Sequence, residues 1–232
     1  MNHLNTEVLP NAESFGRTSS SPHPLLIVTD VDSTLIAEEV IEELAERAGT
    51  RRLVAEVTAR AMNGEIDFAQ SLRERVATLK GVPESVFGEV LAQVHPTPGA
   101  QALIDALHSK GGVFGVVSGG FVEVVAPLCE RLGIDHFLAN RLEVEGGHLT
   151  GRVLGDIVTA ESKVQALSRW AEDHEIDLSR SVAIGDGAND VPMMKTAGLG
   201  IAFCAKPSVQ EAMEYSLNIR RLDVLIGPLG LS

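Results

Sequence analysis

Cysteine is scarce in this chain, with only Cys129 and Cys204 among 232 residues. Neither has another cysteine or a histidine at metal-ligand spacing, which excludes a disulfide framework and a zinc site. Aromatic residues make up 4% of the chain, too few for a surface that stacks on nucleic-acid bases. No apolar run reaches the ~18 residues of a membrane span, and no basic start followed by an apolar stretch marks a secretory signal. We therefore expect a cytoplasmic protein.

Positive charge is also in short supply. The chain has 19 Lys and Arg against 32 Asp and Glu, a net charge of −13. Such a surface repels phosphate backbones and anionic membranes, so we expect no nucleic-acid and no membrane partner. An anionic substrate would need local cations or a metal. Hydrophobic residues at 44% and charged residues at 22% are typical of a globular protein, and this length buries a sizeable core.

Hydrophobic patterning divides the chain into three parts. Residues 1–24 lack apolar periodicity and are rich in Ser, Asn and Pro, which predicts a flexible N-terminal tail. Residues 25–36 and 95–232 alternate buried strands with helices, which predicts an α/β core: a doubly wound, mostly parallel, Rossmann-like sheet. Residues 37–94 show four helical patterns in a row, the last beginning at Pro83, which predicts a small helical cap inserted after the first strand.

The first strand leads directly into two closely spaced carboxylates, Asp30 and Asp32. In an extended chain, residues i and i+2 point to the same side, and ligands bind at the carboxyl ends of the strands in such sheets. Two close carboxylates repel each other unless a cation lies between them or one keeps a proton. Mg²⁺, a hard cation with oxygen ligands, is the natural partner. The alternative is an ordinary turn, in which Asp is also favoured.

Ser118-Gly119-Gly120 follows a second buried strand and is expected to begin a helix. Glycine lets the backbone approach an anion closely, and amides at a helix start favour negative charge. Ser118 adds a hydroxyl donor. The pattern predicts a phosphate-binding segment, and the alternative is a glycine turn that joins strand to helix.

A third buried strand is followed by a polar segment with Asp186, Asn189 and Asp190. A helix over about 189–197 would place the last two in its first turn, where acidic groups are favoured by the dipole. Three polar side chains in five positions exceed what a helix cap requires. Lys163 is expected early in another helix, where the macrodipole disfavours a cation; the alternative for Lys163 is a solvated surface lysine.

Together these segments resemble a known family. Asp30-Val31-Asp32-Ser33-Thr34, Ser118-Gly119-Gly120-Phe121, Lys163 and Gly185-Asp186-Gly187-Ala188-Asn189-Asp190 are similar to the four motifs of the haloacid-dehalogenase-like phosphatases. The resemblance extends from about Leu25 to about Leu222. It implies a Mg²⁺-dependent phosphatase that works through an aspartyl-phosphate.

The resemblance also implies roles for individual residues. Asp30 would be the nucleophile, and Asp32 the general acid for the leaving oxygen and then the base for water. Asp30, the backbone carbonyl of Asp32, and Asp186 would bind Mg²⁺, with Asp190 in the surrounding shell. The implied substrate-binding residues are Ser118, Gly119, Lys163 and Asn189 in the core, and Glu39, Met62, Phe68 and Arg75 in the cap.

The resemblance is more specific in residues 61–64, 68–75 and 139–142, which are similar to family members that act on O-phosphoserine. It implies that the substrate is this small molecule and that the reaction is the last step of serine biosynthesis. Glu39 would meet the substrate ammonium and Arg75 its carboxylate, with Met62 and Phe68 shaping the pocket. The alternatives are a phosphotransferase that passes the phosphoryl group to homoserine, another small-molecule phosphatase of the superfamily, and a non-catalytic binding protein. We expect a monomer or a homodimer.

Overall fold

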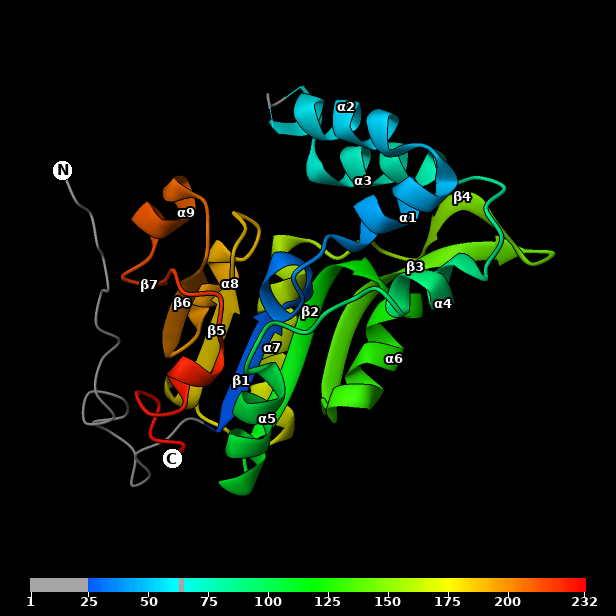
Figure 1. Ribbon diagram of the computed structural model, residues 1–232. Helices are drawn as coiled ribbons and strands as arrows, with labels where there is room; N and C mark the ends of the chain where they lie inside the picture. The colour runs from blue at the N-terminus through cyan, green and yellow to red at the C-terminus, as the bar shows by residue number, and fades with distance from the viewer. Residues whose placement is uncertain (1–24, 63–64) are drawn as a thin grey trace.

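The protein is built around a seven-stranded sheet with strand order β4-β3-β2-β1-β5-β6-β7 (Figure 1). The structure, a computed structural model, describes residues 25–62 and 65–232. Neighbouring strands pair in parallel, except for the antiparallel pair β3 and β4. The strands are β1 (Leu26–Asp30), β2 (Val113–Phe121), β3 (His136–Glu145), β4 (His148–Leu154), β5 (Ser181–Gly185), β6 (Leu199–Phe203) and β7 (Tyr215–Leu217).

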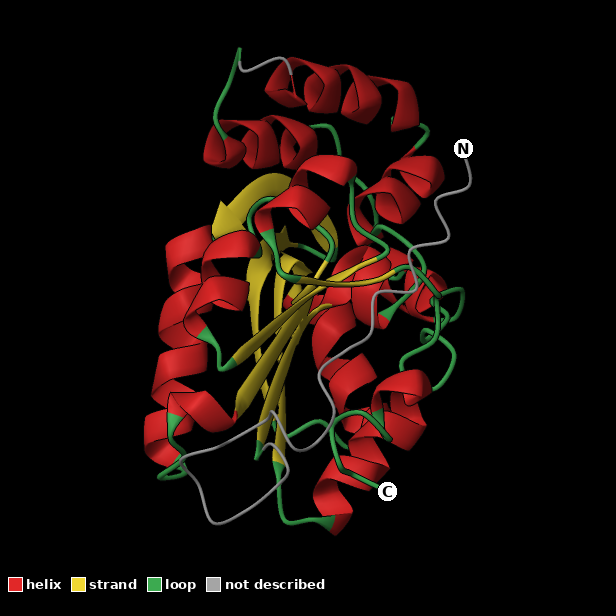
Figure 2. Ribbon diagram, turned by 90° about the vertical axis from the view of Figure 1, so that its left-hand side faces the viewer, coloured by secondary structure: helices red, strands yellow, loops and turns green. Residues whose placement is uncertain are grey.

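Helices cover both faces of this sheet (Figure 2). Side chains alternate between the faces of a strand, so Ile27 packs in one apolar cluster while Leu26 and Val28 pack in another. The first cluster includes side chains of α5 and α6, and the second includes those of α7, α8 and α9. The predicted doubly wound α/β class is confirmed. These helices are α5 (Ala100–Ser109), α6 (Val122–Leu132), α7 (Ala160–Asp173), α8 (Val191–Thr196) and α9 (Pro207–Ala212).

Four further helices lie between β1 and α5 in the chain, and α1 to α3 stand over the carboxyl edge of the sheet (Figure 1). The two linkers that join this insertion to the core run side by side. Ile36 bridges Pro96, and the amide of Ala37 donates to the carbonyl of His95 at 3.1 Å. The helices are α1 (Val40–Ala48), α2 (Arg51–Met62), α3 (Phe68–Ala77) and α4 (Val86–Leu91).

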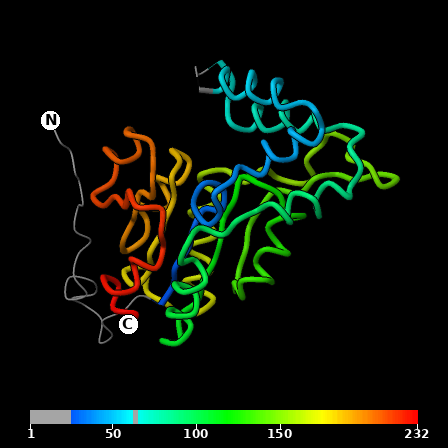
Figure 3. Tube along the Cα trace, in the orientation of Figure 1, coloured from blue at the N-terminus to red at the C-terminus, as the bar shows by residue number. Residues whose placement is uncertain are grey.

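The segment between α3 and α4 is tied to the β3–β4 hairpin, as the Cα trace shows (Figure 3). The amide of Gly81 donates to the carbonyl of Leu149 at 2.8 Å, and Pro83 bridges His148. The prediction that Pro83 begins a helix was wrong, since α4 begins at Val86.

Two other local predictions need correction. Ser118-Gly119-Gly120 does not begin a helix: β2 continues to Phe121, which pairs with Asn140 of β3, and α6 begins at Val122. Asn189 and Asp190 precede α8, whose first residue is Val191. The predicted tail, residues 1–24, lies outside the described residues. Within the described part of the chain, no helix has both the length and the apolar character needed to cross a membrane.

Candidate active site

Three parallel strands bring the predicted motifs to one edge of the sheet. β1 lies between β2 and β5, so Asp30 at its end is flanked by Gly119 of β2 and by Asp186, which follows β5. The chain winds away from β1 in both directions, and the carboxyl edge at such a switch point is where α/β sheets bind ligands.

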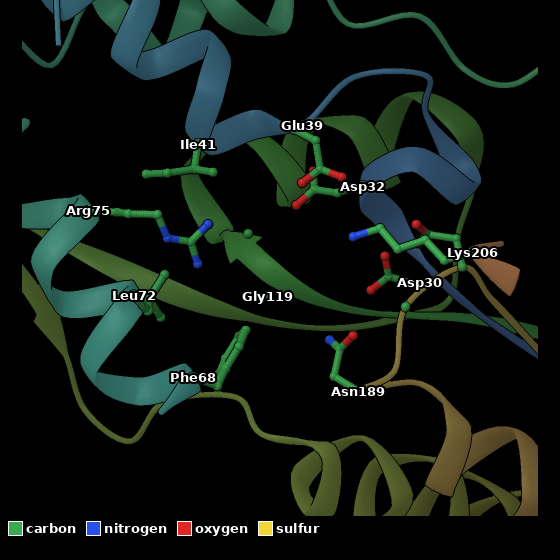
Figure 4. Close-up of a pocket in the computed structure, with 13 residues that line it drawn as sticks. Asp30, Asp32, Glu39, Ile41, Phe68, Leu72, Arg75, Gly119, Asn189 and Lys206 are labelled. Atoms are coloured by element: carbon green, nitrogen blue, oxygen red, sulfur yellow. The ribbon is translucent and has the colours of Figure 1, made fainter. Parts of the chain in front are cut away.

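A cavity of about 210 Å³ lies at this point, between the strand ends and α3 (Figure 4). Its volume suits a small metabolite, since sites for drug-sized ligands hold roughly 300–1,000 Å³. The lining residues are Asp30, Asp32, Glu39, Ile41, Phe68, Leu72, Arg75, Gly119, Gly120, Asp186, Gly187, Asn189 and Lys206.

Lys163 joins two carboxylates directly behind the cavity. Its ammonium donates to Asp30 Oδ1 at 2.5 Å and to Asp190 Oδ1 at 2.6 Å, and all three residues are buried. Burial alone would lower the pKa of Lys163, but the charges of Asp30 and Asp190 outweigh it and raise that pKa above its usual range. Lys163 is therefore a permanent cation, and the solvated-surface alternative for it is excluded.

Asp30, Asp186 and Asp190 form a cluster in which one carboxylate oxygen of each lies within 4.8 Å of the others. Burial, followed by the charges of Asp190 and Glu39, raises the pKa of Asp186 to about 6. Three carboxylates face the single charge of Lys163, so the cluster has excess negative charge. A donor set made only of oxygen atoms fits a hard divalent cation such as Mg²⁺.

Asp32 lies in the short turn after β1 and is differently placed. Its Oδ1 accepts a hydrogen bond from the amide of Val40 at 3.1 Å, and within the described chain no cation pairs with it. Burial, and after it the charge of Glu39, raises the pKa of Asp32 to about 7. Asp32 can therefore hold a proton at neutral pH while Asp30, paired with Lys163, faces the cavity.

Ser33 positions Glu39, which directly precedes α1. Ser33 has φ 55°, a left-handed conformation that is uncommon for a residue other than glycine. Its hydroxyl donates to Glu39 Oε1 at 2.7 Å, and its carbonyl accepts from Arg220 Nη1 at 3.0 Å. The carboxylate of Glu39 is thereby fixed beside Asp32 (Figure 4).

The opposite wall of the cavity comes from one face of α3. Phe68, Leu72 and Arg75 follow the i, i+4, i+7 spacing of that face. Burial lowers the pKa of Arg75, and the charges of Glu39 and Asp32 oppose this. A Cβ atom on Gly119 would lie 3.3 Å from Phe68 Cζ, so glycine at this position allows the cap to approach the strand closely.

Ser118 is fully buried behind Gly119. Its Oγ accepts a hydrogen bond from the amide of Gly120 at 2.8 Å, which leaves its hydroxyl proton free to donate. Asn140 donates to the carbonyl of Gly119 at 2.9 Å and accepts from the amide of Val158 at 2.9 Å. The glycine segment of β2 is thus held in a fixed position beside Asp30.

Most of the residues predicted from the sequence are brought together. Asp30, Asp32, Asp186 and Asn189 line the cavity from the core, and Glu39, Phe68 and Arg75 line it from the cap, while Ser118, Lys163 and Asp190 support it from behind. The side chain of Met62 lies outside the described part of the structure. Sequence reasoning gave no role to Ile41, Leu72 and Lys206, while Gly120 and Gly187 lie within its predicted motifs.

Two of the missed residues carried a usable signal. Leu72 lies between Phe68 and Arg75 on the helical face that their spacing defines. Lys206 follows the strand that ends at Phe203, and residues after strand ends are where the other motifs were found.

Comparison with known proteins agrees with this geometry. The model of the family described as haloacid dehalogenase-like hydrolase matches residues 27–195. A phosphoserine phosphatase of Lactococcus lactis subsp. lactis (strain IL1403) is 53% identical over 197 residues, which covers 85% of this chain and 91% of the relative. A solved structure described as a phospho-aspartyl intermediate analogue of phosphoserine phosphatase has a TM-score of 0.82 at 42% identity, covering 88% of this chain and 98% of that one. A substrate-bound phosphoserine phosphatase complex gives the same TM-score and identity.

The chain belongs to the haloacid dehalogenase-like hydrolases. Within that family it falls in the phosphoserine phosphatase group, where the resemblance seen in the sequence had placed it.

Proposed function

We propose that this protein hydrolyses O-phosphoserine to serine and inorganic phosphate through a phosphorylated Asp30, the last step of serine biosynthesis. The observation that carries the proposal is the arrangement of charge along one cavity. A buried carboxylate held by Lys163 lies at one end, and the oppositely charged Glu39 and Arg75 lie toward the cap. The Lactococcus relative and the substrate-bound structure described above are named phosphoserine phosphatases.

In the first step Asp30 attacks the phosphorus atom. Lys163 occupies Oδ1 of Asp30, so Oδ2 is the oxygen available to form the new P–O bond. The bond between phosphorus and the serine oxygen breaks, and protonated Asp32 gives its proton to that oxygen, releasing neutral serine hydroxyl. A pKa of about 7 suits Asp32 to this task, because a general acid works best when its pKa lies near the operating pH.

In the second step the aspartyl-phosphate is hydrolysed. Asp32, now ionised, takes a proton from a water molecule as that water attacks the phosphorus. The bond between phosphorus and Asp30 Oδ2 breaks, which restores the Asp30 carboxylate and releases inorganic phosphate, while Asp32 keeps the proton that it took from the water. One residue can act as acid and then as base because each step leaves it in the protonation state that the next step needs.

Asp30, Asp186 and the backbone carbonyl of Asp32 are the groups we propose to hold Mg²⁺, with Asp190 supporting them. The oxygen-only cluster and its excess negative charge support this. When bound, such a cation neutralises charge that accumulates on the transferring phosphoryl group. Lys163 contributes by holding Asp30 in place, and Ser118 contributes a free hydroxyl proton.

Selectivity for an amino-acid phosphate would come from the cap, which we propose to be residues 37–94. Glu39 suits the substrate ammonium, and the guanidinium of Arg75 suits its carboxylate, because a guanidinium binds carboxylates through two parallel hydrogen bonds. Phe68 closes the wall between Gly119 and α3.

The deciding experiment measures phosphate release from a panel of phospho-amino acids and sugar phosphates with Mg²⁺ present. We expect O-phosphoserine to give the highest kcat/KM, and added homoserine not to divert the phosphoryl group. Asp30→Asn should abolish turnover with unchanged circular dichroism, because an amide oxygen is too weak a nucleophile. Activity of Asp30→Asn within tenfold of wild type would contradict the nucleophile assignment.

A further inference from the structure

Lys206 stands at a fourth strand end of the same sheet edge. β6 lies beside β5 and ends at Phe203, and Lys206 follows three residues later, immediately before α9. Its side chain lines the cavity together with Asp30 and Asp32, and Figure 4 shows its ammonium extending toward these two carboxylates.

The backbone just before Lys206 is held in place by two hydrogen bonds. The amide of Cys204 donates to the carbonyl of Leu217 at 2.8 Å, with Cys204 at φ 46°. The carbonyl of Ala205 accepts from Gln210 Nε2 at 2.6 Å. A non-glycine residue in this region of φ is uncommon, and such strained backbone is found at functional loops. The backbone before Lys206 is thus fixed, and the lysine side chain itself is exposed.

Among the cations at the cavity, Lys206 differs from Lys163 and Arg75 in its surroundings. Lys163 is already bound to Asp30 and Asp190, and Arg75 lies on the cap wall. Within residues 25–62 and 65–232, no carboxylate pairs with Lys206. It is a cation available at the core end of a cavity lined by four carboxylates: Asp30, Asp32, Glu39 and Asp186.

A phosphate monoester enters this cavity as a dianion, against the ionised carboxylates among those four groups and a net charge of −13. We propose that Lys206 is the phosphate-capture residue: its ammonium binds a non-bridging phosphoryl oxygen of the arriving substrate and of the departing inorganic phosphate. This rests on the proposed function. An exposed cation such as Lys206 acts mainly on association and on salt dependence, whereas buried Lys163 acts on the fixed geometry of Asp30.

The test compares Lys206→Gln and Lys206→Arg with Lys195→Gln, which removes the same charge from an exposed position on α8. The measurements are kcat/KM for O-phosphoserine at low and high ionic strength, and the affinity for inorganic phosphate by calorimetry. For Lys206→Gln we expect a fall of about five- to twentyfold in both at low salt, with the larger share in KM. The salt dependence of kcat/KM should also flatten. Lys206→Arg should stay within about twofold of wild type, since the charge is retained.

Two results would overturn the proposal. One is a Lys206→Gln variant whose phosphate affinity and kcat/KM match those of wild type. The other is an equal loss in Lys195→Gln, which would mean that only the overall charge matters. Absence of wild-type turnover on O-phosphoserine would contradict the proposed function instead, and in that case calorimetry with inorganic phosphate still decides whether Lys206 captures the anion.

Discussion

At the scale of single residues, Asp30 and Asp32 show how two carboxylates two positions apart acquire different chemistry. Burial raises the pKa of both carboxyls; for Asp30 the hydrogen-bonded Lys163 opposes that rise, whereas for Asp32 the charge of Glu39 adds to it and the pKa reaches about 7. A carboxyl that keeps its proton and a carboxylate that attacks are the pair that the proposed reaction needs.

The pKa of Asp32 predicts a difference between two substrates as pH rises. Protonated Asp32 disappears above about pH 7, so kcat/KM for O-phosphoserine should fall by about tenfold per pH unit there. p-Nitrophenyl phosphate has a leaving group that needs no protonation, and its alkaline limb should be nearly flat. Steady-state rates between pH 6 and 9 make the comparison, and parallel alkaline limbs would rule out Asp32 as the acid.

Arg75 provides a test of selectivity. Arg75→Ala should lower kcat/KM for O-phosphoserine about 30- to 800-fold, which corresponds to about 2–4 kcal/mol of lost transition-state stabilisation. The reason is that the substrate carboxylate loses a charge-assisted pair. p-Nitrophenyl phosphate has no carboxylate and should be hardly affected. Arg52→Ala is the matched control, since Arg52 is a solvated arginine of the cap, 81% exposed. An equal fall for both substrates would show that Arg75 supports the cap structure instead.

At the scale of elements, the sequence predicted the strands and turns that depend only on residues close together in the chain. The buried strands before Asp30 and Asp186 were found because a short apolar run followed by polar residues needs no distant information. The end of β2 was missed, since Ser118-Gly119-Gly120 extends as a strand only through pairing with β3. The contact of Lys163 with Asp30 joins residues 133 positions apart, and a single sequence holds no direct record of such a contact.

Asn140 offers a test of how elements hold the site together. Its buried carboxamide links the carbonyl of Gly119 on β2 to the amide of Val158 before α7. Asn140→Ala leaves both backbone groups unpaired, so we expect a loss of about 1–3 kcal/mol in the free energy of unfolding for each group, together with a lower kcat. Urea unfolding measures the first. Asn218→Ala, an exposed asparagine, is the control, and equal stability of the two variants would contradict the linking role.

At the scale of the whole molecule, the site costs stability when no cation occupies it. The pKa of Asp186 is about 6 and that of Asp32 about 7, both raised by burial. A carboxyl whose pKa is higher in the folded state favours folding below its unfolded pKa, and this contribution is lost as pH rises through the folded pKa. Between about pH 4 and 7, these two groups therefore destabilise the metal-free protein progressively.

Asp186→Asn should reverse part of that loss. In excess chelator at pH 8, its Tm should exceed that of wild type, because a neutral amide replaces an ionised carboxylate beside Asp190. Mg²⁺ should raise the Tm of wild type through binding to the folded state, and raise that of Asp186→Asn much less. Calorimetric scans at pH 5.5 and pH 8 test both statements. A variant that is less stable than wild type in chelator at pH 8 would contradict the charge argument.

The backbone bridge between Ile36 and Pro96 means that the chain leaves the core and re-enters it at neighbouring points. Bridged residues of antiparallel chains have Cα atoms about 4.5–5.5 Å apart, a gap that a loop of about 2–5 residues spans. An ancestral chain could therefore gain, lose or exchange the whole helical insertion without any change in strand order. Substitutions in α3 can therefore reshape one wall of the cavity without altering the strand ends that hold Asp30 and Asp186.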